Sequence, residues 1–195
     1  NRGGVALSLA QWFEYSSEDS QAIDYYSMCL RGNTESSSEC GSRLGDLYAR
    51  LANPQKAASF YNQVSERGKS KKDNSPWIGY ARFKLVEAFE REKHFSSPLQ
   101  LPDDRLKRGL EERLKFLETL NKRYQDVVEV SGPWAIAALD RLALWVMNFA
   151  DEIDQIAPPP TANADAIKGF KQSLKSISDP LRQKAAESWK TAYQK

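Results

Sequence analysis

Apolar residues recur every three to four positions over most of the chain, which is the spacing of one face of an α-helix. No stretch alternates between apolar and polar residues for long enough to predict a strand. Serine, asparagine and proline interrupt the pattern where helices would begin, because these residues suit the N-cap and the first helical turn. The predicted helices span 5–15, 20–31, 39–51, 54–69, 76–95, 103–131, 133–156 and 180–193, with a weaker one over 164–176.

The N-terminal part of the chain repeats itself at an offset of 35 positions. The first copy is Leu9, Ala10, Phe13, Ala22 and Tyr26, and the second is Leu44, Gly45, Tyr48, Ala57 and Tyr61. The small residues would lie where two antiparallel helices cross closely, the large residues of the first helix would fill the space beside the crossing, and the tyrosines would pack on the following pair. Because one helix pair cannot bury both of its apolar faces, neighbouring pairs must stack.

This pattern resembles the tetratricopeptide repeat family. Leu44-Gly45-x-x-Tyr48 followed by Ala57-x-x-x-Tyr61 carries the resemblance, and the first copy is a looser match. The family favours proline where this chain has Lys69, at the close of the second helix. The resemblance implies an all-α fold, a right-handed superhelical stack of eight or nine helices in antiparallel pairs, forming a single domain over 1–195. The expected repeats are 5–35 and 39–70, followed by degenerate pairs at 76–131 and 133–195.

Two tryptophan-led helices extend the pattern into the second half of the chain. Trp77 and Trp134 each follow a proline, lie 57 residues apart, and precede a small residue four positions later, Ala81 or Ala138. The stretch from Trp134 also looks like tetratricopeptide proteins of bacterial envelope machines, including gliding-type assemblies. That resemblance implies a bacterial setting in the periplasm or envelope rather than in the cytoplasm.

Charge and hydropathy narrow the classes of partner. The chain carries 28 basic and 26 acidic residues, a net charge of +2, and no basic stripe of the kind that binds nucleic acid. The most apolar stretch, 134–150, contains Asp140, Arg141 and Asn148, so no membrane span is predicted. The chain begins with Asn1 rather than methionine, and we expect a trimmed fragment or a mature product.

No pattern of catalytic, metal-binding or cofactor-binding residues stands out. The sequence has no serine elbow, phosphate-binding glycine loop or zinc spacing, and its lone His94 is expected at a helix end. We therefore predict no enzymatic activity, no metal and no cofactor. Cys29 and Cys40 flank a helix–loop–helix corner, where they form either a disulfide or two separate thiols, and a disulfide would indicate an oxidising compartment.

In the tetratricopeptide family, the first helix of each pair lines a concave face. Projecting the helical period onto this chain places six polar residues near that face: Gln11, Glu14, Arg43, Asp46, Arg50 and Arg82. The arginines there could grip a carboxylate or an extended peptide through forked hydrogen bonds. The alternative is that these residues form ion pairs across neighbouring helices, and Asp46 with Arg50 is such a pair at i and i+4.

These observations favour a non-enzymatic scaffold or adaptor that binds a protein or peptide within a multi-protein assembly. One alternative is an accessory or catalytic domain acting on cell-envelope polymers, which requires a carboxylate pair in a deep pocket. Another is an oligomerisation module built on the long helix 103–131, although tertiary packing on a neighbouring helix is the usual explanation of such an apolar stripe. That stripe is Leu106, Leu110, Leu114, Leu117, Leu120, Tyr124 and Val128.

Overall fold

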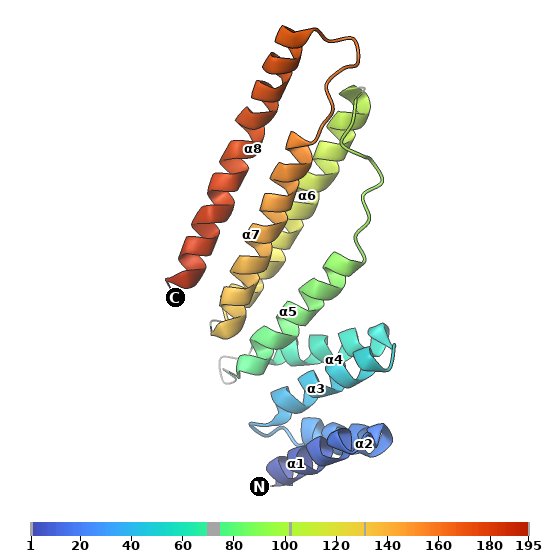
Figure 1. Ribbon diagram of the computed structural model, residues 1–195. Coiled ribbons are helices and arrows are strands. Elements are labelled where there is room, and N and C mark those ends of the chain that lie inside the picture. Colours follow the sequence, from blue (N-terminus) through green and yellow to red (C-terminus); the bar gives the residue numbers. More distant parts are fainter. Residues whose placement is uncertain (1, 70–74, 102, 131, 195) are drawn as a thin grey trace. The chain divides into compact units, whose positions relative to one another are not determined.

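The computed structural model describes residues 2–69, 75–101, 103–130 and 132–194, and over these ranges the chain is all-α (Figure 1). The described residues form eight helices and no strand, as the sequence predicts. Their bounds are α1 Arg2–Tyr15, α2 Asp19–Arg31, α3 Ser37–Arg50, α4 Pro54–Arg67, α5 Pro76–Arg91, α6 Asp103–Val128, α7 Pro133–Asp154 and α8 Ala164–Tyr193. Residues 70, 131 and 195, at which predicted boundaries fall, lie outside the described ranges.

The C-terminal helix corrects the prediction of two separate helices at 164–176 and 180–193. α8 begins after Asn163, whose side-chain oxygen accepts from the backbone N–H of Ala166, and continues through Pro180. Proline removes one backbone hydrogen bond, but here its ring is exposed, and the apolar face continues on both sides of it through Leu174 and Leu181. Packing on both sides therefore holds the helix together where the local sequence predicts a start.

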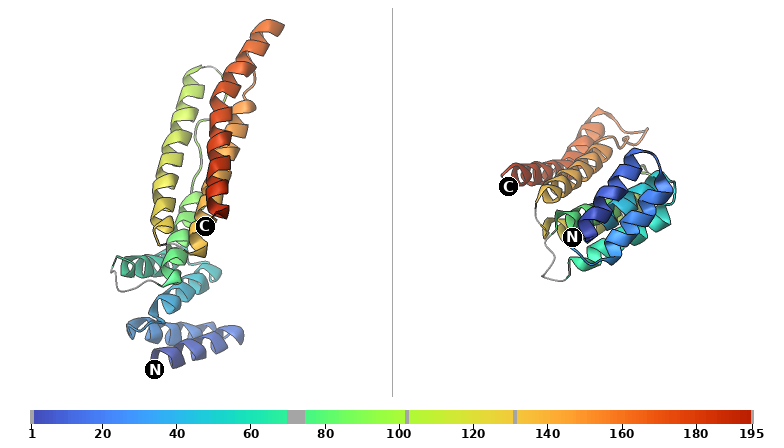
Figure 2. Two further views of the ribbon diagram at one scale, coloured as in Figure 1. Left: turned by 90° about the vertical axis from the view of Figure 1, so that its left-hand side faces the viewer. Right: turned by 90° about the horizontal axis from the view of Figure 1, so that it is seen from below.

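The contacts of the chain divide it into two compact units. The first comprises 1–91 with 129–134, and the second comprises 92–128 with 135–195. In the first unit α1 pairs with α2 and α3 with α4, while α2 contacts α3 and α4 contacts α5 (Figures 1 and 2). Consecutive helices therefore pack against one another, as expected for stacked pairs.

The two hairpin turns of the first unit are built in the same way. Ser17 and Ala52, which are 35 positions apart, both adopt positive φ, at 61° and 54°. The next residue donates its N–H back to an aromatic position, from Glu18 to the Phe13 carbonyl and from Asn53 to the Tyr48 carbonyl, each over 2.9 Å. The 35-residue repeat is therefore a repeat of structure as well as of residue type.

Ring stacking follows the same register. Phe13 stacks on Tyr25 with centroids 5.3 Å apart, and Tyr48 stacks on Phe60 with centroids 5.4 Å apart. Tyr25 and Phe60 are not part of the predicted pattern, although they too are 35 positions apart. The stacks join the two helices of each hairpin beside their turn.

The small residues of the repeat lie where the sequence predicts. Ala10 and Ala22 are fully buried and Ala57 is nearly so. Gly45 is buried against Tyr61, and a Cβ built at this glycine would clash with the tyrosine ring. The close approach of α3 and α4 therefore depends on the missing side chain at Gly45.

Leu9 departs from the prediction that it fills space beside a helix crossing. Its side chain is 38% exposed, whereas its counterpart Leu44 is fully buried. Both occupy the same position in their hairpins, but Leu44 faces the core shared with α2, and none of the described residues covers Leu9 in that way. The difference arises from which helix lies next to each, a property that the hairpin sequence does not contain.

The second unit packs α6, α7 and α8 around a core contributed by all three helices, including Leu110, Phe149 and Leu174. The predicted stripe of α6 is wrong at Leu114, which is 49% exposed. Leu114 comes two steps of four residues after Leu106, and each step turns about 40° beyond a full turn, so Leu114 lies off the buried face. Phe116, Leu120 and Tyr124 mark the face that is buried.

Candidate functional site: the faces of the first unit

Five of the six residues predicted for a concave groove make side-chain contacts with one another or with their neighbours. Gln11 donates to Glu39 over 3.2 Å, and the same carboxylate oxygen accepts from Arg43 over 2.8 Å. The Arg43 guanidinium also lies over the Trp77 ring, 5.3 Å from its centroid. This cluster ties α1, α3 and α5 together through charge-assisted contacts.

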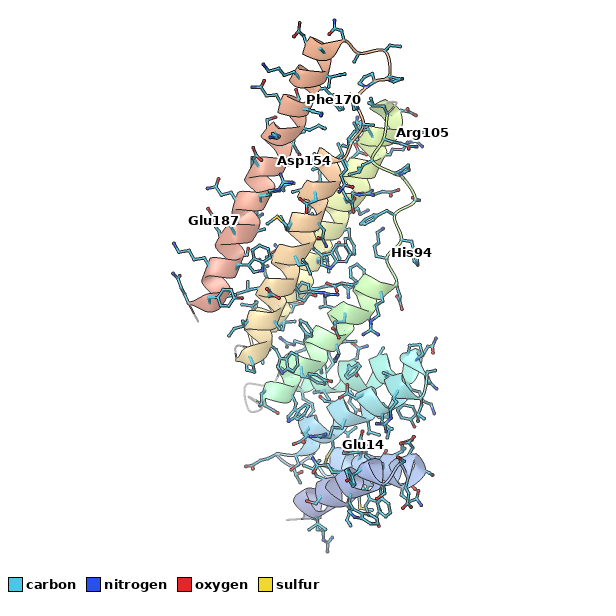
Figure 3. The ribbon with its side chains drawn as sticks, viewed as in Figure 1. Glu14, His94, Arg105, Asp154, Phe170 and Glu187 are labelled. Carbon is cyan, nitrogen blue, oxygen red and sulfur yellow. A yellow bond between two sulfur atoms is a disulfide. The ribbon has the colours of Figure 1, made fainter. Side chains whose placement is uncertain are left out.

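The predicted pair of Asp46 with Arg50 is replaced by longer-range partners. Arg50 reaches across to the first hairpin, where it contacts Glu14 at 3.2 Å and Asp19 at 2.8 Å (Glu14 is labelled in Figure 3). Asp46 instead accepts hydrogen bonds from the phenols of Tyr61 and Tyr80, each over 2.6 Å. Arg50 and Glu14 therefore form an interhelical ion pair, the alternative that the sequence left open, whereas Asp46 bonds to phenols instead. Arg82 lies beside Gly68, where a Cβ added to the glycine would be 3.3 Å from the Nη2 atom of Arg82.

Three buried or half-buried tyrosines have pKa values raised above their usual range. Burial is the main cause for Tyr61 and Tyr80, and hydrogen bonds to the Asp46 carboxylate add to it. Burial also raises the pKa of Tyr26, whose phenol donates to Glu14 over 2.6 Å. Each phenol stays protonated because its ionised form would be desolvated next to a carboxylate.

These tyrosines predict a loss of stability in alkali. The folded chain holds the phenolic protons more tightly than the unfolded chain, whose tyrosines titrate near pH ~10. The stability that each phenol adds to the folded chain is therefore fully present below that pH. It falls as pH rises, by up to about 1.4 kcal/mol per pH unit for each phenol. Urea unfolding between pH 8 and 11 should show this fall, and Tyr61→Phe with Tyr80→Phe should flatten it. Parallel pH profiles for the two proteins would contradict the assignment.

The cysteines resolve the choice that the sequence left open. Cys29 and Cys40 form a disulfide, with Cα atoms 6.1 Å apart, and both side chains are buried. Cys29 lies in α2 and Cys40 in α3, so the bond joins the first hairpin to the second. Ser37 supports the same corner by donating to the Cys29 carbonyl over 3.1 Å.

A second cluster lies in the second unit, where a small pocket is lined by Phe95, Phe116, Trp145 and neighbouring residues. Its charged groups are Arg113 and Glu152, which form an ion pair with each other. Arg113 also donates to the carbonyls of Ser97 and Gly109, and its guanidinium lies 4.3 Å from the Phe95 centroid. Arg113 thus fixes the connector before α6 to both α6 and α7. Glu152, the carboxylate that lines this pocket, is paired with Arg113.

His94 lies in the same connector, beyond the end of α5 at Arg91, which corrects its predicted place at a helix end (Figure 3). In this connector the Arg113 guanidinium lies over the Phe95 ring, and the Glu112 carboxylate accepts from the backbone N–H groups of Ser96 and Ser97. In the described part of the chain, no group of three or more histidine, cysteine, aspartate or glutamate side chains is arranged to hold a metal ion.

The outer face of α1 differs most from its counterpart in the repeat. Val5, Leu9 and Trp12, at helical positions i, i+4 and i+7, are 61%, 38% and 57% exposed. Their counterparts 35 positions later, in α3, are all fully buried. Those counterparts are Cys40, Leu44 and Leu47. An apolar stripe that is covered in one hairpin is thus open to solvent in the other, and it is called the α1 outer face below.

Sequence comparisons add no relative from which a role could be transferred. No protein-family model matches the chain, and no curated protein matches it significantly. Among the described helices, none combines the length and the apolar character needed to cross a bilayer.

Proposed function

We propose that this chain is a non-enzymatic protein-interaction module, a scaffold or adaptor within a multi-protein assembly. The observation that supports it best is the α1 outer face, where an exposed tryptophan and two exposed aliphatic side chains form one stripe. Contiguous exposed apolar side chains of this kind are typical of protein-binding surfaces. The polar residues of α1 and α3 hold the stack together, while the α1 outer face binds the partner.

The proposed architecture is a tetratricopeptide-type superhelix. The turn hydrogen bonds and ring stacks that recur after 35 residues support a regular relation between successive hairpins. A regular relation of this kind generates a solenoid when it is repeated.

The proposed setting is an oxidising compartment, and a bacterial periplasm or envelope fits this requirement. The disulfide between Cys29 and Cys40 supports it, because such bonds persist outside reducing cytoplasm. Mass spectrometry of the protein isolated from its own cells under alkylating conditions tests this setting. Free, alkylated Cys29 and Cys40 in most molecules would contradict it.

Affinity capture from the source cells tests the proposed function. The wild-type protein should retain a defined partner, and Trp12→Glu should lose it at least tenfold, because a carboxylate cannot be desolvated in an apolar contact. Tyr193→Glu is the matched control, since Tyr193 is an aromatic residue 84% exposed at the other end of the chain. Equal recovery of the same partners by wild type and Trp12→Glu would contradict the proposal, provided both proteins have the same melting temperature.

A further inference from the structure

We propose that the α1 outer face binds an amphipathic α-helix of a second protein, which lies against α1 as α2 lies against α3. This inference rests on the proposed function and specifies its partner. Its basis is the internal repeat itself. The equivalent stripe in α3, 35 residues further on, is covered by α2, so the chain itself shows which element can cover such a stripe.

The contact between α2 and α3 supplies the template. Cys29 meets Cys40 through the disulfide, and Leu30 lies close enough to α3 that a Cβ on Gly41 would be 3.2 Å from its Cδ1. Moving back by 35 positions, Val5 takes the place of Cys40 and Ala6 that of Gly41. The partner helix therefore needs an apolar residue of valine size to meet Val5 and a leucine-sized one beside Ala6.

The stripe also sets the length of the partner helix. Val5 to Trp12 covers seven residue steps, or about 10 Å along the axis at 1.5 Å per residue. A helix that covers this distance with its own i, i+3, i+4 and i+7 positions needs about three turns. Smaller apolar residues would pack beside Trp12, because its ring takes up more room than the side chain of its counterpart Leu47.

The α1 outer face carries no charged group between Val5 and Trp12. Arg2 lies at one end of α1, and Glu14 at the other end is already engaged with Tyr26 and Arg50. Binding should therefore depend weakly on salt, because no ion pair forms across the seam. A partner helix with an uncharged apolar face fits this surface, and a basic or acidic one does not.

Among the described helices, the faces of a second copy that resemble that of α2 are not available, although its own α1 outer face is an exposed apolar stripe. The faces of α2 and α4 that carry the repeat residues are buried in the chain's own cores; they include Ala22, Tyr26 and Cys29 in α2 and Ala57, Tyr61 and Val64 in α4. The solvent-facing side of α8 carries exposed lysines, including Lys168, Lys171 and Lys175. The α2-like helix that the repeat requires would thus come from a different protein, and pairing of two α1 outer faces is the outcome that a dimer in sedimentation would reveal.

A synthetic helix copied from the chain's own repeat is a direct probe. The peptide of residues 53–68 with Ser65 replaced by leucine carries the α2-like face without a thiol, because Val64 stands at the position of Cys29 and Ser65 at that of Leu30. Stapled on its solvent face and fluorescently labelled, it should bind the full-length protein in an anisotropy titration. Trp12→Glu should weaken binding at least tenfold, Tyr193→Glu should leave it unchanged, and raising NaCl from about 50 to about 300 mM should change it less than twofold. A control peptide with Ala57, Tyr61 and Val64 replaced by serine should not bind.

Several results would overturn the inference. They are absence of peptide binding at several hundred micromolar, equal binding to Trp12→Glu, or a dimer in sedimentation that Trp12→Glu dissociates. Binding of the wild type, but not of Trp12→Glu, to vesicles of phosphatidylcholine and phosphatidylglycerol would likewise assign the stripe to a membrane surface. If the peptide fails while affinity capture still depends on Trp12, the proposed function stands and only the helical partner is wrong. Trp12 is 57% exposed, so unchanged circular dichroism and melting temperature are expected for the variant.

Discussion

Replacing Gly45 with valine should destabilise the first unit by about 3 kcal/mol, because overpacking a closely packed crossing forces side chains and backbone apart. A Cβ at Gly45 collides with the Tyr61 ring, and that ring cannot easily turn away. Its phenol is held by Asp46 over 2.6 Å, and its side chain is only 6% exposed. Urea unfolding followed by circular dichroism would measure the loss.

Gly169→Val is the matched control for this substitution. Gly169 also lies within a helix, α8, but a Cβ there meets nothing within 4 Å. Valine is a slightly better helix former than glycine, so this variant should be neutral or slightly more stable. The double variant Gly45→Val with Tyr61→Leu should recover part of the loss by removing the ring. A Gly45→Val protein within about 0.5 kcal/mol of wild type, the range of an ordinary surface substitution, would show that α3 and α4 do not approach closely at this point.

Removing the disulfide should cost about 3 kcal/mol, the size that loop-closure entropy in the unfolded chain predicts for a short loop. The bond closes a loop with a sequence separation of 11. Alanine is the suitable replacement at both positions, since Cys29 and Cys40 are buried and serine would bring hydroxyl groups into the core. Thermal and urea unfolding of Cys29→Ala/Cys40→Ala against wild type would measure the difference.

Reduction provides an independent check on the same quantity. A strong reductant such as TCEP should lower the stability of the wild-type protein and leave the double alanine variant unchanged. The first hairpin should open first in hydrogen exchange, because the disulfide links α2 to α3. Wild-type stability that does not respond to complete reduction would contradict the role given to this bond.

The hairpins of the first unit are predictable from sequence because their determinants are local. Gly45, Ala10, Ala22 and Ala57 mark helix crossings, and Asn53-Pro54 marks a helix start, as the capping bond from Lys56 to Asn53 confirms. Such signals are read over a few residues, and they do not depend on what else the chain does. The same reasoning locates α1 to α7 to within a few residues.

Prediction fails where the outcome depends on distant residues. Pro180 has the sequence context of a helix start, but packing of Leu174 and Leu181 against the second unit's core carries α8 through it. One alternative from the sequence pairs Arg50 with Asp46 one turn away, but Glu14 and Asp19 on the first hairpin reach it instead. Burial of Leu9 is expected from its counterpart in the repeat, yet burial requires a covering helix.

The candidate binding surface escapes prediction for the same reason. Val5 and Trp12 are apolar and helical, which predicts burial, and only their exposed fractions distinguish them from core residues. The 35-residue repeat identifies Cys40 and Leu47 as the counterparts of Val5 and Trp12. The repeat does not show which of the two faces is buried by another helix. The polar residues expected to line a groove, by contrast, are recognised from residue type, and Gln11 and Arg50 among them bond to neighbouring helices.

The matched turns at Ser17 and Ala52 make the stack a modular unit that duplication can lengthen. In a tandem copy of residues 18–52 inserted after Ala52, Glu18 would follow a left-handed residue as it does after Ser17. Each added copy would carry its own Cys29–Cys40 cross-link. Nearest-neighbour cooperativity would make such an array melt at a higher temperature with each added module, up to a plateau.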